Sequence, residues 1–558
     1  MAKNSSYLLV AAIDFGTTYS GYAFSLKYAF DKDPLTIDAN QAWNAGEKQL
    51  LSLKTPTCLL LDSYKQFDSF GYEAESKYAE IVMENEQDNY YYFHRFKMSL
   101  HTNKNVSKDM LLKDITGKSM PAIDVFTLSI MAMKNHLMSN LVTRGTGVEM
   151  TDIRWVLTVP AIWTDNAKQF MRKCRKGNMM GNSAGIPKDN LLLALEPEAA
   201  SIYCQYLRTD KLTGIEPGFT MSEPGTKYMI VDLGGGTADI TVHEKISDGC
   251  LKELCGANGG NCGGTSVDSE YIQMLVSILG ESLIEIFKHE NPESYLDLIR
   301  EFETKKKNNH IFTGYKKVNM VIPMTVINKL CITHTHKDFK SAVASSKFSD
   351  SIVIRGDKVR IDPAIFKKLF FFVGGFSTCG LVQEAVRREF PNCRVIIPFD
   401  PDLAVLKGAV LFGHTLDLIS SRISRFTYGI SFNPKFNSEI HDIKHRKFID
   451  GFWRCRHAFD KIVEKDTIIS IGATFKRSYK PQKDYSKTWF KIYASENYNP
   501  VHTTEDGCVF LGKVGIDLSN SKSRQGLEVE FTFGNTELGL TAIETETGIK
   551  CDAQFALI

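Results

Sequence analysis

Residues 228–242 read YMIVDLGGGTADITV, and this stretch decides the fold. An apolar run ends at Asp232, a glycine-rich turn follows, and apolar residues then alternate with polar ones, which predicts a strand, a tight turn and a second strand. Glycine has no side chain to hold a ligand away, so the backbone N–H groups of such a turn can surround a phosphate. The turn consists of Gly234, Gly235, Gly236 and Thr237, whose hydroxyl adds a donor. Asp232 is then placed to hold a hydrated Mg²⁺ ion, whereas a glycine-rich hairpin without a ligand would need no flanking aspartate.

The same pattern occurs near the N-terminus. Residues 8–24 read LLVAAIDFGTTYSGYAF, with an apolar strand that ends at Asp14 and an alternating strand after the turn. The turn contains Gly16, Thr17 and Thr18, and Tyr19 follows. Two such hairpins, about 220 residues apart, predict a duplicated domain whose halves hold one triphosphate from both sides.

Both hairpins resemble the phosphate loops of the actin, sugar-kinase and 70 kDa heat-shock protein superfamily. DFGTTYSGYAF and DLGGGTADI are most similar to the divergent heat shock 70 kDa protein 12 subfamily. The resemblance implies an α/β fold, with an actin-like (ribonuclease H-like) duplicated two-lobe ATPase domain followed by an all-β domain. It places lobe I at residues 1–220, lobe II at residues 221–421 and the β-rich domain at residues 422–558. It also implies ATP and Mg²⁺ as cofactors, with both turns on the phosphates.

Bulk properties exclude several classes of protein. The chain has 558 residues, 43% hydrophobic and 24% charged, which is typical of globular domains with large cores. A net charge of +2 favours neither nucleic acid nor a membrane surface as the partner. No apolar run near the N-terminus is long enough to span a bilayer. The twelve cysteines form no CxxC pairs, which favours reduced thiols over a metal site or disulfides, and we expect a cytoplasmic protein that also enters the nucleus.

Residues 191–204, LLLALEPEAASIYC, predict a strand with Glu196 at its end and a helix that begins beside Pro197. A carboxylate at the end of a parallel strand lies where such sheets bind ligands. The stretch resembles the heat-shock family's EP(T/E)AA motif, and the resemblance implies that Glu196 contacts Mg²⁺-bound water together with Asp14 and Asp232. The alternative role is a helix cap.

Two further segments carry residues that the resemblance assigns. In FHRFKMSL, Lys97 is similar to the family's lysine that orients the attacking water, alongside Thr237, although it could equally be a lysine on an exposed helix face. TVPAIW resembles the family's TVPA segment, which implies that Pro160 relays the nucleotide state between domains. Lys168 stands where the family has an arginine in that relay, so the charge is kept and the bidentate fork is lost.

Lobe II carries the residues that the resemblance places around the nucleoside. Gly263 and Gly264 are similar to a loop that approaches the phosphates, although a flexible surface loop would have the same composition. A predicted helix places Glu303, Lys306 and Lys307 at i, i+3 and i+4, which repeats the family's clasp on ribose and adenine. An exposed Glu–Lys pair is the alternative.

Residues 361–380, IDPAIFKKLFFFVGGFSTCG, depart from the family. A helix of several turns is missing before the VGG strand, and this either reflects a deletion or indicates a rebuilt lobe. Without that helix we expect Tyr295, Leu298, Ile299 and Phe302 to lose their cover. Gly374 and Gly375 still match the adenosine-binding glycines, and Asp402 matches the family's adenosine-side aspartate.

After about residue 422 the sequence alternates in short runs separated by Gly, Asn, Asp and Pro, which predicts an all-β module. It resembles a reduced substrate-binding β-domain without its helical lid. Residues 444–447 and 454–457 form a basic patch around Phe448, Phe452 and Trp453. We expect a solvated loop with buried aromatic side chains rather than a nucleic-acid site.

These observations predict an atypical heat-shock-70-type protein that binds ATP and ADP and hydrolyses Mg·ATP weakly. Its β-domain would bind protein clients or signalling proteins, and we expect a monomer. Two alternatives stay open. One is a nucleotide-sensing scaffold with little ATPase activity, and the other is a small-molecule kinase, which needs an acceptor pocket with an aspartate base that the sequence does not single out.

Overall fold

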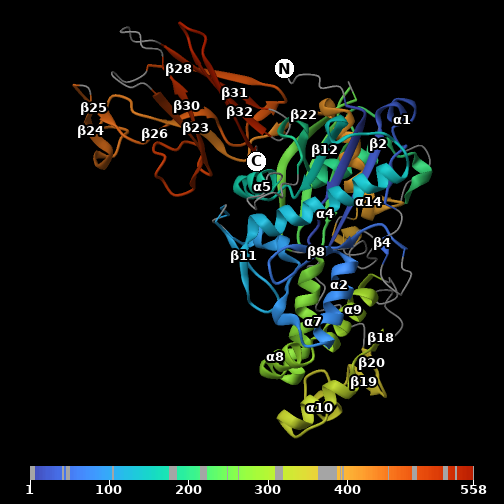
Figure 1. Ribbon diagram of the computed structural model, residues 1–558. Helices are drawn as coiled ribbons and strands as arrows, with labels where there is room; N and C mark the ends of the chain where they lie inside the picture. The colour runs from blue at the N-terminus through green and yellow to red at the C-terminus, as the bar shows by residue number, and fades with distance from the viewer. Residues whose placement is uncertain are drawn as a thin grey trace.

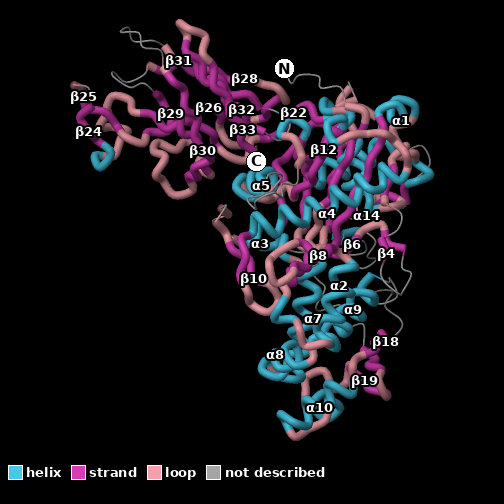
Figure 2. Tube along the Cα trace, in the orientation of Figure 1, coloured by secondary structure: helices cyan, strands magenta, loops and turns pink. Residues whose placement is uncertain are grey.

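The structure is a computed structural model. It describes residues 7–40, 43–44, 51–103, 106–107, 109–174, 185–213, 223–247, 249–261, 263–307, 318–361, 386–389, 391, 395–449, 451–480, 487–518, 526–533 and 537–556. Figure 1 shows two sheets with their helices and a separate β-rich part beside α5. The region below the sheets is mostly helical, and the β-rich part consists almost entirely of strands (Figure 2).

The N-terminal hairpin forms the centre of the first sheet. The strands of this sheet are β1 (Leu9–Asp14), β2 (Tyr19–Leu26), β3 (Asp38–Ala39), β6 (Thr55–Pro56), β12 (Ile153–Val159) and β13 (Leu191–Leu195). β1, β2 and β3 are antiparallel neighbours, whereas β12 and β13 run parallel to β1. The resulting order, β13-β12-β1-β2-β3, is that of an actin-like, ribonuclease H-like lobe.

Helices cover both faces of this sheet. Successive residues of a strand point to opposite sides, and in β1 the side chains on both sides are buried. Leu9 and Ile13 pack in the core under α4 (Ala122–Thr143). Val10 packs on the other face, where α14 and α6 lie. These two helices are α6 (Glu196–Tyr206) and α14 (Pro401–His414). The carboxyl end of β1 is therefore held between two packed layers.

The stretch 228–242 forms the predicted hairpin in a second sheet. The strands of this sheet are β15 (Lys227–Leu233), β16 (Ala238–Lys245), β17 (Leu251–Gly260), β22 (Ile419–Ile423) and β27 (Ile468–Ser470). The first three are antiparallel neighbours, as in the first sheet, which confirms the duplicated hairpin. β22 runs parallel to the start of β17, and β27 from the β-rich part pairs with β22. The second sheet is thus continued by a strand at the boundary of the second lobe and by one from the β-rich part.

A helical layer follows the second hairpin and corrects one expectation. Its elements are α7 (Gly264–Leu279), α8 (Glu281–Glu290), α9 (Pro292–Lys307), α10 (Met324–Thr335), α11 (Phe339–Ala344), β18 (Val318–Val321), β19 (Ile352–Arg355) and β20 (Lys358–Ile361). The inward face of α9 was expected to lose its cover, but Leu298 and Phe302 are 1% exposed, and Tyr295 and Ile299 are half-buried. The reason is that Phe302 stacks on Tyr271 of α7, with ring centroids 4.0 Å apart. The segment expected to lack a helix, near residues 369–372, lies outside the described residues.

The remaining elements of the two-lobed part are short. They are α1 (Lys27–Lys32), α2 (Tyr72–Met83), α3 (Ser99–Thr102), α5 (Asp165–Lys173), β4 (Trp43–Asn44), β5 (Leu51–Ser52), β7 (Cys58–Leu61), β8 (Phe67–Phe70), β9 (Tyr91–His94), β10 (Leu111–Lys113), β11 (Ser119–Pro121), β14 (Leu212–Thr213) and β21 (Ile397–Pro398). None of the described helices combines the length and the apolar character needed to cross a membrane.

The β-rich part contains two four-stranded antiparallel sheets around one core. One sheet has the order β26 (Ala458–Val463), β23 (Thr427–Phe432), β29 (Lys487–Ser495) and β30 (Cys508–Asp517). The other has the order β28 (Thr474–Tyr479), β31 (Leu527–Phe533), β32 (Glu537–Glu544) and β33 (Lys550–Ala556). Side chains of both sheets, including Ile430 and Phe531, share a single buried cluster. This is the packing of a β-sandwich, and β33 lies against α5 (Figure 2).

A hairpin at the far end of the sandwich corrects a second expectation. Its strands are β24 (Arg446–Ile449) and β25 (Phe452–Cys455). Phe448, Phe452 and Trp453 are 50–58% exposed rather than buried. The hairpin pairs only with itself among the described strands, so its aromatic side chains have no second sheet to pack under.

Candidate functional site

The two glycine-rich turns meet between the sheets. A Cβ atom built on Gly235 would lie 2.3 Å from Thr18 Oγ1, and one built on Gly236 would lie 2.6 Å from Thr17 Oγ1. The turns are therefore in direct contact, and only glycine permits this approach. A phosphate chain could be held between them only after the turns had moved apart.

A third loop supports the second turn from behind. The N–H groups of Gly263, Gly264 and Thr265 donate to the carbonyl oxygens of Gly236, Gly234 and Gly235, at 3.2, 3.2 and 2.7 Å. Because the C=O and N–H of a trans peptide point in opposite directions, the N–H groups of this turn face away from the supporting loop. The predicted residues Gly263 and Gly264 thus act on the turn itself.

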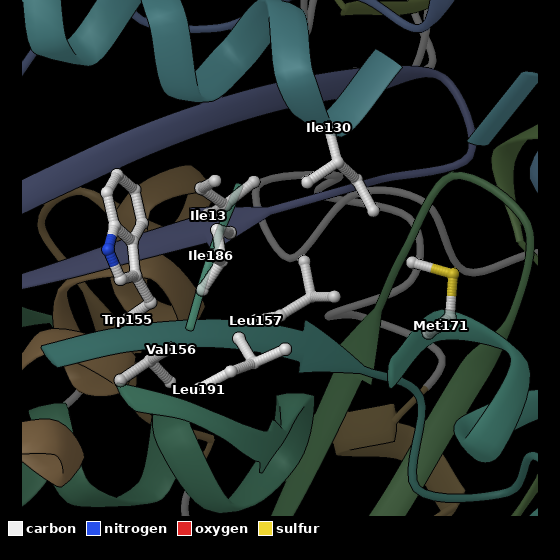
Figure 3. Close-up of a pocket in the computed structure, with 8 residues that line it drawn as sticks. All are labelled: Ile13, Ile130, Trp155, Val156, Leu157, Met171, Ile186 and Leu191. Atoms are coloured by element: carbon white, nitrogen blue, oxygen red, sulfur yellow. The ribbon is translucent and has the colours of Figure 1, made fainter. Parts of the chain in front are cut away.

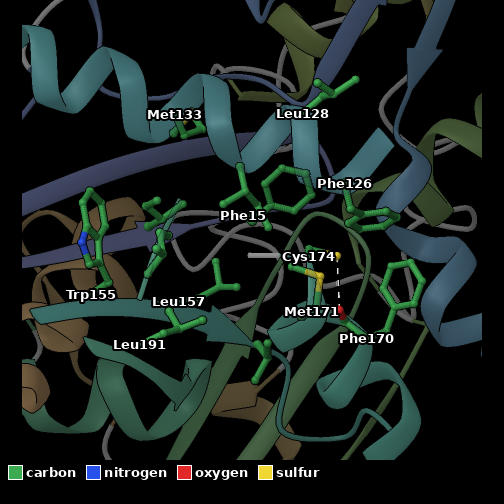
Figure 4. Close-up of a cluster of buried hydrophobic side chains, with 14 of the residues drawn as sticks. Phe15, Phe126, Leu128, Met133, Trp155, Leu157, Phe170, Met171, Cys174 and Leu191 are labelled. Atoms are coloured by element: carbon green, nitrogen blue, oxygen red, sulfur yellow. Dashed lines mark hydrogen bonds between the residues drawn. The ribbon is translucent and has the colours of Figure 1, made fainter. Parts of the chain in front are cut away.

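The first turn is anchored from both sides. The Phe15 ring, directly after β1, contacts Phe126 of α4 with a centroid distance of 5.7 Å, as Figure 4 shows. Thr57 donates its hydroxyl to the Gly16 carbonyl oxygen at 2.8 Å and its backbone N–H to the Thr18 carbonyl oxygen at 2.9 Å. Tyr19 begins β2 and pairs with Pro56.

Asp14 ends β1 with both carboxylate oxygens bound. Oδ1 accepts from the Thr158 hydroxyl at 2.8 Å, and Oδ2 lies 2.6 Å from the Lys54 ammonium. Burial alone would raise the pKa of Asp14, but Lys54 and Lys97 hold it below its usual value. Asp14 is therefore ionised at neutral pH, paired with a lysine that the motif analysis did not assign to the site.

Glu196 and Lys97 form a buried ion pair, which places the predicted lysine beside the predicted carboxylate. The two side chains meet at 2.9 Å, and Lys97 is 2% exposed, so it is not on an exposed helix face. The Lys97 ammonium also lies 5.1 Å from the Trp163 ring centroid. Burial raises the pKa of Glu196 to about 7, with Lys97 opposing the shift and Asp14 and Asp239 adding to it. A carboxyl with this pKa can exchange a proton near neutral pH.

The second hairpin supplies two aspartates that face each other across its strands. Asp232 and Asp239 are register partners in β15 and β16. Burial, Glu196 and Asp239 hold the pKa of Asp232 well above its usual value. Asp239 is 1% exposed, and its Oδ1 accepts the Ile162 N–H at 2.9 Å. Asp239 therefore joins the site to the segment that follows Pro160.

The charges of this cluster do not balance. Asp14, Glu196, Asp232 and Asp239 act on one another electrostatically, together with Lys54 and Lys97. Burial and repulsion within the cluster raise the pKa values of Glu196 and Asp232, so these two carboxyl groups bind protons more tightly than usual. With all four carboxyl groups ionised, two ammonium groups leave an excess of two negative charges, which one divalent cation would balance. Within the described residues, no three His, Cys, Asp or Glu side chains are arranged to bind a metal directly. The carboxylate oxygens of Asp14, Glu196 and Asp232 have the chemistry to accept hydrogen bonds from the waters of a hydrated Mg²⁺ ion.

The described part of the structure does not show whether the residues predicted to contact the nucleoside lie together. Glu303, Lys306 and Lys307 lie on α9, as predicted, but their side chains are outside the described set. Gly374 and Gly375 also lie outside it. Asp402 is exposed in the first turn of α14, close enough to Lys54 to raise its pKa.

The segment after Pro160 touches the site on one side and β22 on the other. The Ala161 carbonyl oxygen accepts from Lys168 at 3.1 Å and from Arg425 at 2.9 Å. Arg425 follows β22, and Arg422 within β22 binds Glu198 of α6 through two hydrogen bonds of 2.6 and 2.5 Å. Contacts thus run from Asp239 through residues 160–162 to the start of the sandwich.

A cavity elsewhere in the first lobe has the wrong chemistry for a nucleotide. It lies under α4, and its lining is apolar (Figure 3). The lining residues are Ile13, Ile130, Trp155, Val156, Leu157, Met171, Ile186 and Leu191. A site for phosphate has to be sought at the turns.

Sequence reasoning missed Lys54, Asp239 and the arginines of the β22 region. One observation could have found Asp239, because it stands opposite Asp232 in the predicted hairpin. Lys54 offered no comparable indication, since its partner Asp14 is 40 residues away in the sequence. Arg422 and Arg425 could not be found, because they depend on where the sandwich packs.

The chain is similar to known proteins over nearly its whole length, and no family model matches the sequence. Heat shock 70 kDa protein 12A of Homo sapiens is 33% identical, covering 98% of this chain and 91% of that protein. The Mus musculus protein of the same name gives the same values. Heat shock 70 kDa protein 12B of Homo sapiens is 30% identical, covering 98% and 90%.

Solved structures resemble the chain more distantly. A non-polymerisable quadruple mutant of pCBH ParM has a TM-score of 0.32 at 12% identity, covering 73% of this chain and 98% of its own. The actin-like protein Alp7A has a TM-score of 0.30 at 13% identity, covering 73% and 96%. The ethanolamine utilization protein EutJ from Carboxydothermus hydrogenoformans has a TM-score of 0.25 at 15% identity, covering 72% and 89%.

Proposed function

Because the chain belongs to the heat shock 70 kDa protein 12 family, we propose that it binds Mg·ATP between its two glycine-rich turns and hydrolyses it slowly to ADP and phosphate. The observation that carries the proposal is the cluster of four buried carboxyl groups beside both turns, in which burial and mutual repulsion raise the pKa values of Glu196 and Asp232, as expected for a site that a cation would stabilise in its ionised form. When bound, Mg²⁺ would neutralise charge that develops on the phosphates during transfer.

In this proposal, different residues bind the phosphates and the waters of the metal. The N–H groups of Gly235, Gly236 and Thr237 hold phosphate oxygens from one side, and the turn of Thr17 and Thr18 holds them from the other. Asp232 and Glu196 accept hydrogen bonds from the metal's waters. Asp14 shares this task only in part, because Lys54 occupies one of its oxygens.

Hydrolysis needs a positioned water and a place for its proton. Lys97 and the Thr237 hydroxyl orient the attacking water. Glu196, with a pKa of about 7, accepts the proton that the water loses. The Trp163 ring and the burial of Lys97 exclude other water from this point.

Closure of the lobes is passed to the sandwich through the segment after Pro160. A movement of Asp239 displaces Ile162, to which it is hydrogen-bonded, and thereby Ala161, which holds Lys168 and Arg425. Because β22 pairs with β27, the same movement reaches the β-rich part at a second point. Protein clients or signalling proteins bind there in this proposal.

The remaining assignments complete this picture of the chain. Residues 1–220 and 221–421 are the two lobes, and residues 422–558 are the client-binding domain. The protein acts as a cytoplasmic and nuclear monomer with no nucleic-acid partner. Glu303, Lys306 and Lys307 of α9, with Gly374, Gly375 and Asp402, surround the nucleoside.

One observation favours a nucleotide-sensing scaffold with little ATPase activity as the second candidate. The turns touch each other, and Lys97 is held by Glu196 at 2.9 Å, so water positioning requires both contacts to rearrange. No acceptor pocket with an aspartate base stands out among the described residues, so a small-molecule kinase has no comparable support.

Titration with Mg·ATP and a phosphate-release assay test the proposal. Gly235→Val should abolish binding, because its side chain would point at Thr18 and fill the space between the turns that the phosphate chain has to occupy. Gly539→Val is the matched control, because a Cβ there meets only ordinary contacts of 3.6 Å in the sandwich. Binding without phosphate release would select the scaffold. Unchanged affinity in a folded Gly235→Val variant would refute the site, and phosphate transfer that requires a small-molecule acceptor would indicate the kinase.

A further inference from the structure

Lys54 occupies a position at the site that the hairpin motifs do not explain. Its ammonium lies 2.6 Å from Asp14 Oδ2, on the carboxylate expected to order the metal's waters. The second oxygen of Asp14 is bound by Thr158 at 2.8 Å. Both oxygens are therefore engaged by the protein, and one of their partners carries a positive charge.

The fold is built to bring Lys54 to this point. Gly21 is the register partner of Asp14 across β1 and β2. A Cβ atom on Gly21 would lie 2.9 Å from Lys54 Cγ, so the missing side chain leaves the path for the lysine stem. Lys54 directly precedes β6, whose Thr55 pairs with Ser20 of β2. The lysine is thus fixed by the same hairpin that carries the first phosphate turn.

The surroundings keep Lys54 charged. Burial opposes the charge, but Asp14, Asp402 and Asp232 outweigh it and raise the pKa of Lys54. Thr57, three residues further along, binds the Gly16 and Thr18 carbonyl oxygens of the first turn. The ammonium is therefore held beside that turn, and its three donors allow it to bind Asp14 and a phosphate oxygen together.

We propose that Lys54 binds the phosphate chain of the nucleotide and takes, at Asp14, the place of a hydrated divalent cation, so that nucleotide binding persists without Mg²⁺. This inference rests on the proposed nucleotide site. The divalent cation would then be left to Asp232 and Glu196. Lys54 is a binding and specificity residue here, since it selects polyphosphates rather than taking part in proton transfer.

Affinity for ATP and ADP, measured by calorimetry with excess Mg²⁺ and again with EDTA, tests this role. Removing the metal should weaken binding to the natural protein by less than about tenfold. Lys54→Met should weaken metal-free binding by about tenfold to a hundredfold, as expected for the loss of a hydrogen bond to a charged group. In the presence of Mg²⁺, the affinity of Lys54→Met for ATP and ADP should fall by a smaller factor. Lys54→Arg should retain most of the affinity that the natural protein has without the metal.

The control is Lys77→Met, which removes an ammonium 3.0 Å from Asp68 on the surface of the same lobe. It should leave both affinities unchanged. If Lys54→Met does not fold, Gly21→Ala provides the test, because it keeps every charge but displaces the lysine stem and should produce the same metal-free loss.

The outcomes separate this inference from the proposed function. Mg²⁺-dependent binding that disappears in EDTA would overturn the role of Lys54 and leave the nucleotide site intact. Equal losses with and without Mg²⁺ in Lys54→Met would do the same, because they would indicate a structural role. No binding of any nucleotide under either condition would overturn the nucleotide site itself, and this inference with it.

Discussion

Glu196 is a side chain of the site whose charge changes near neutral pH. Its pKa rises from 4.5 to about 7 on folding, mainly through burial. A raised carboxyl pKa means that the folded state binds the proton more tightly. Its contribution to stability is therefore present at low pH and is lost as the pH rises from about 4.5 to about 7.

We therefore predict that Glu196→Gln flattens part of the pH dependence of unfolding. Between pH 5 and pH 8 the natural protein should lose on the order of 3 kcal/mol relative to the variant, since one pKa unit corresponds to about 1.4 kcal/mol. Chemical denaturation across this range measures the difference. Parallel stability profiles for the two proteins would show that Glu196 has an ordinary pKa.

At this scale, the sequence predicted the site residues that lie within contiguous motifs. It did not predict the side chains that bind them from elsewhere in the chain. Asp14 and Asp232 end apolar strands beside glycine-rich turns, so their positions follow from local pattern. Lys54 reaches Asp14 only because Gly21 leaves room on the neighbouring strand. Such a contact depends on strand register and on a missing side chain, neither of which a local motif contains.

At the scale of elements, the inward face of α9 is buried by α7 and α8 instead of by the helix that the sequence lacks. Its Phe302 stacks on Tyr271 of α7, and Leu298 is buried in the same cluster. Helical spacing correctly identified this inward face. The partner helix could not be read from the sequence, because α7 and α8 pack against α9 through tertiary contacts that helical periodicity does not specify.

Phe302→Ala should destabilise this helical layer by about 3–5 kcal/mol, the usual cost of removing a buried aromatic side chain. Hydrogen exchange in α7, α8 and α9 is the appropriate measurement, because a multidomain chain need not unfold in one step. Tyr64→Ala is the control, since Tyr64 is 81% exposed. If both variants exchange alike, Phe302 is not packed as described.

The strand β22 and the residues after it connect the site to the sandwich. Arg425→Ala removes the contact with the Ala161 carbonyl oxygen and should reduce the effect of Mg·ATP on the sandwich. Hydrogen exchange in β23 and β29, with and without Mg·ATP, measures that effect. Lys476→Ala removes an exposed ion pair with Glu528 and serves as the control. A nucleotide effect as large in Arg425→Ala as in the natural protein would exclude this route.

For the molecule as a whole, the duplicated hairpin predicted the two-lobed fold well. Each copy encodes the same strands and turn, and the orders β1-β2-β3 and β15-β16-β17 follow from pairing between neighbours in the sequence. The attachment of the sandwich was not predictable, because β22 and β27 join the second sheet from far along the chain. The exposure of the aromatic side chains in the β24–β25 hairpin was not predictable either, because burial there depends on which surfaces pack against each other in the folded chain.

The central claim is that one Mg·ATP is held by both glycine-rich turns at once. Hydrogen exchange of the full chain, with and without Mg·ATP, tests it most directly. The account predicts that the nucleotide slows exchange at residues 15–18 and at residues 234–237 together. Protection of only one turn, or of neither, would contradict it.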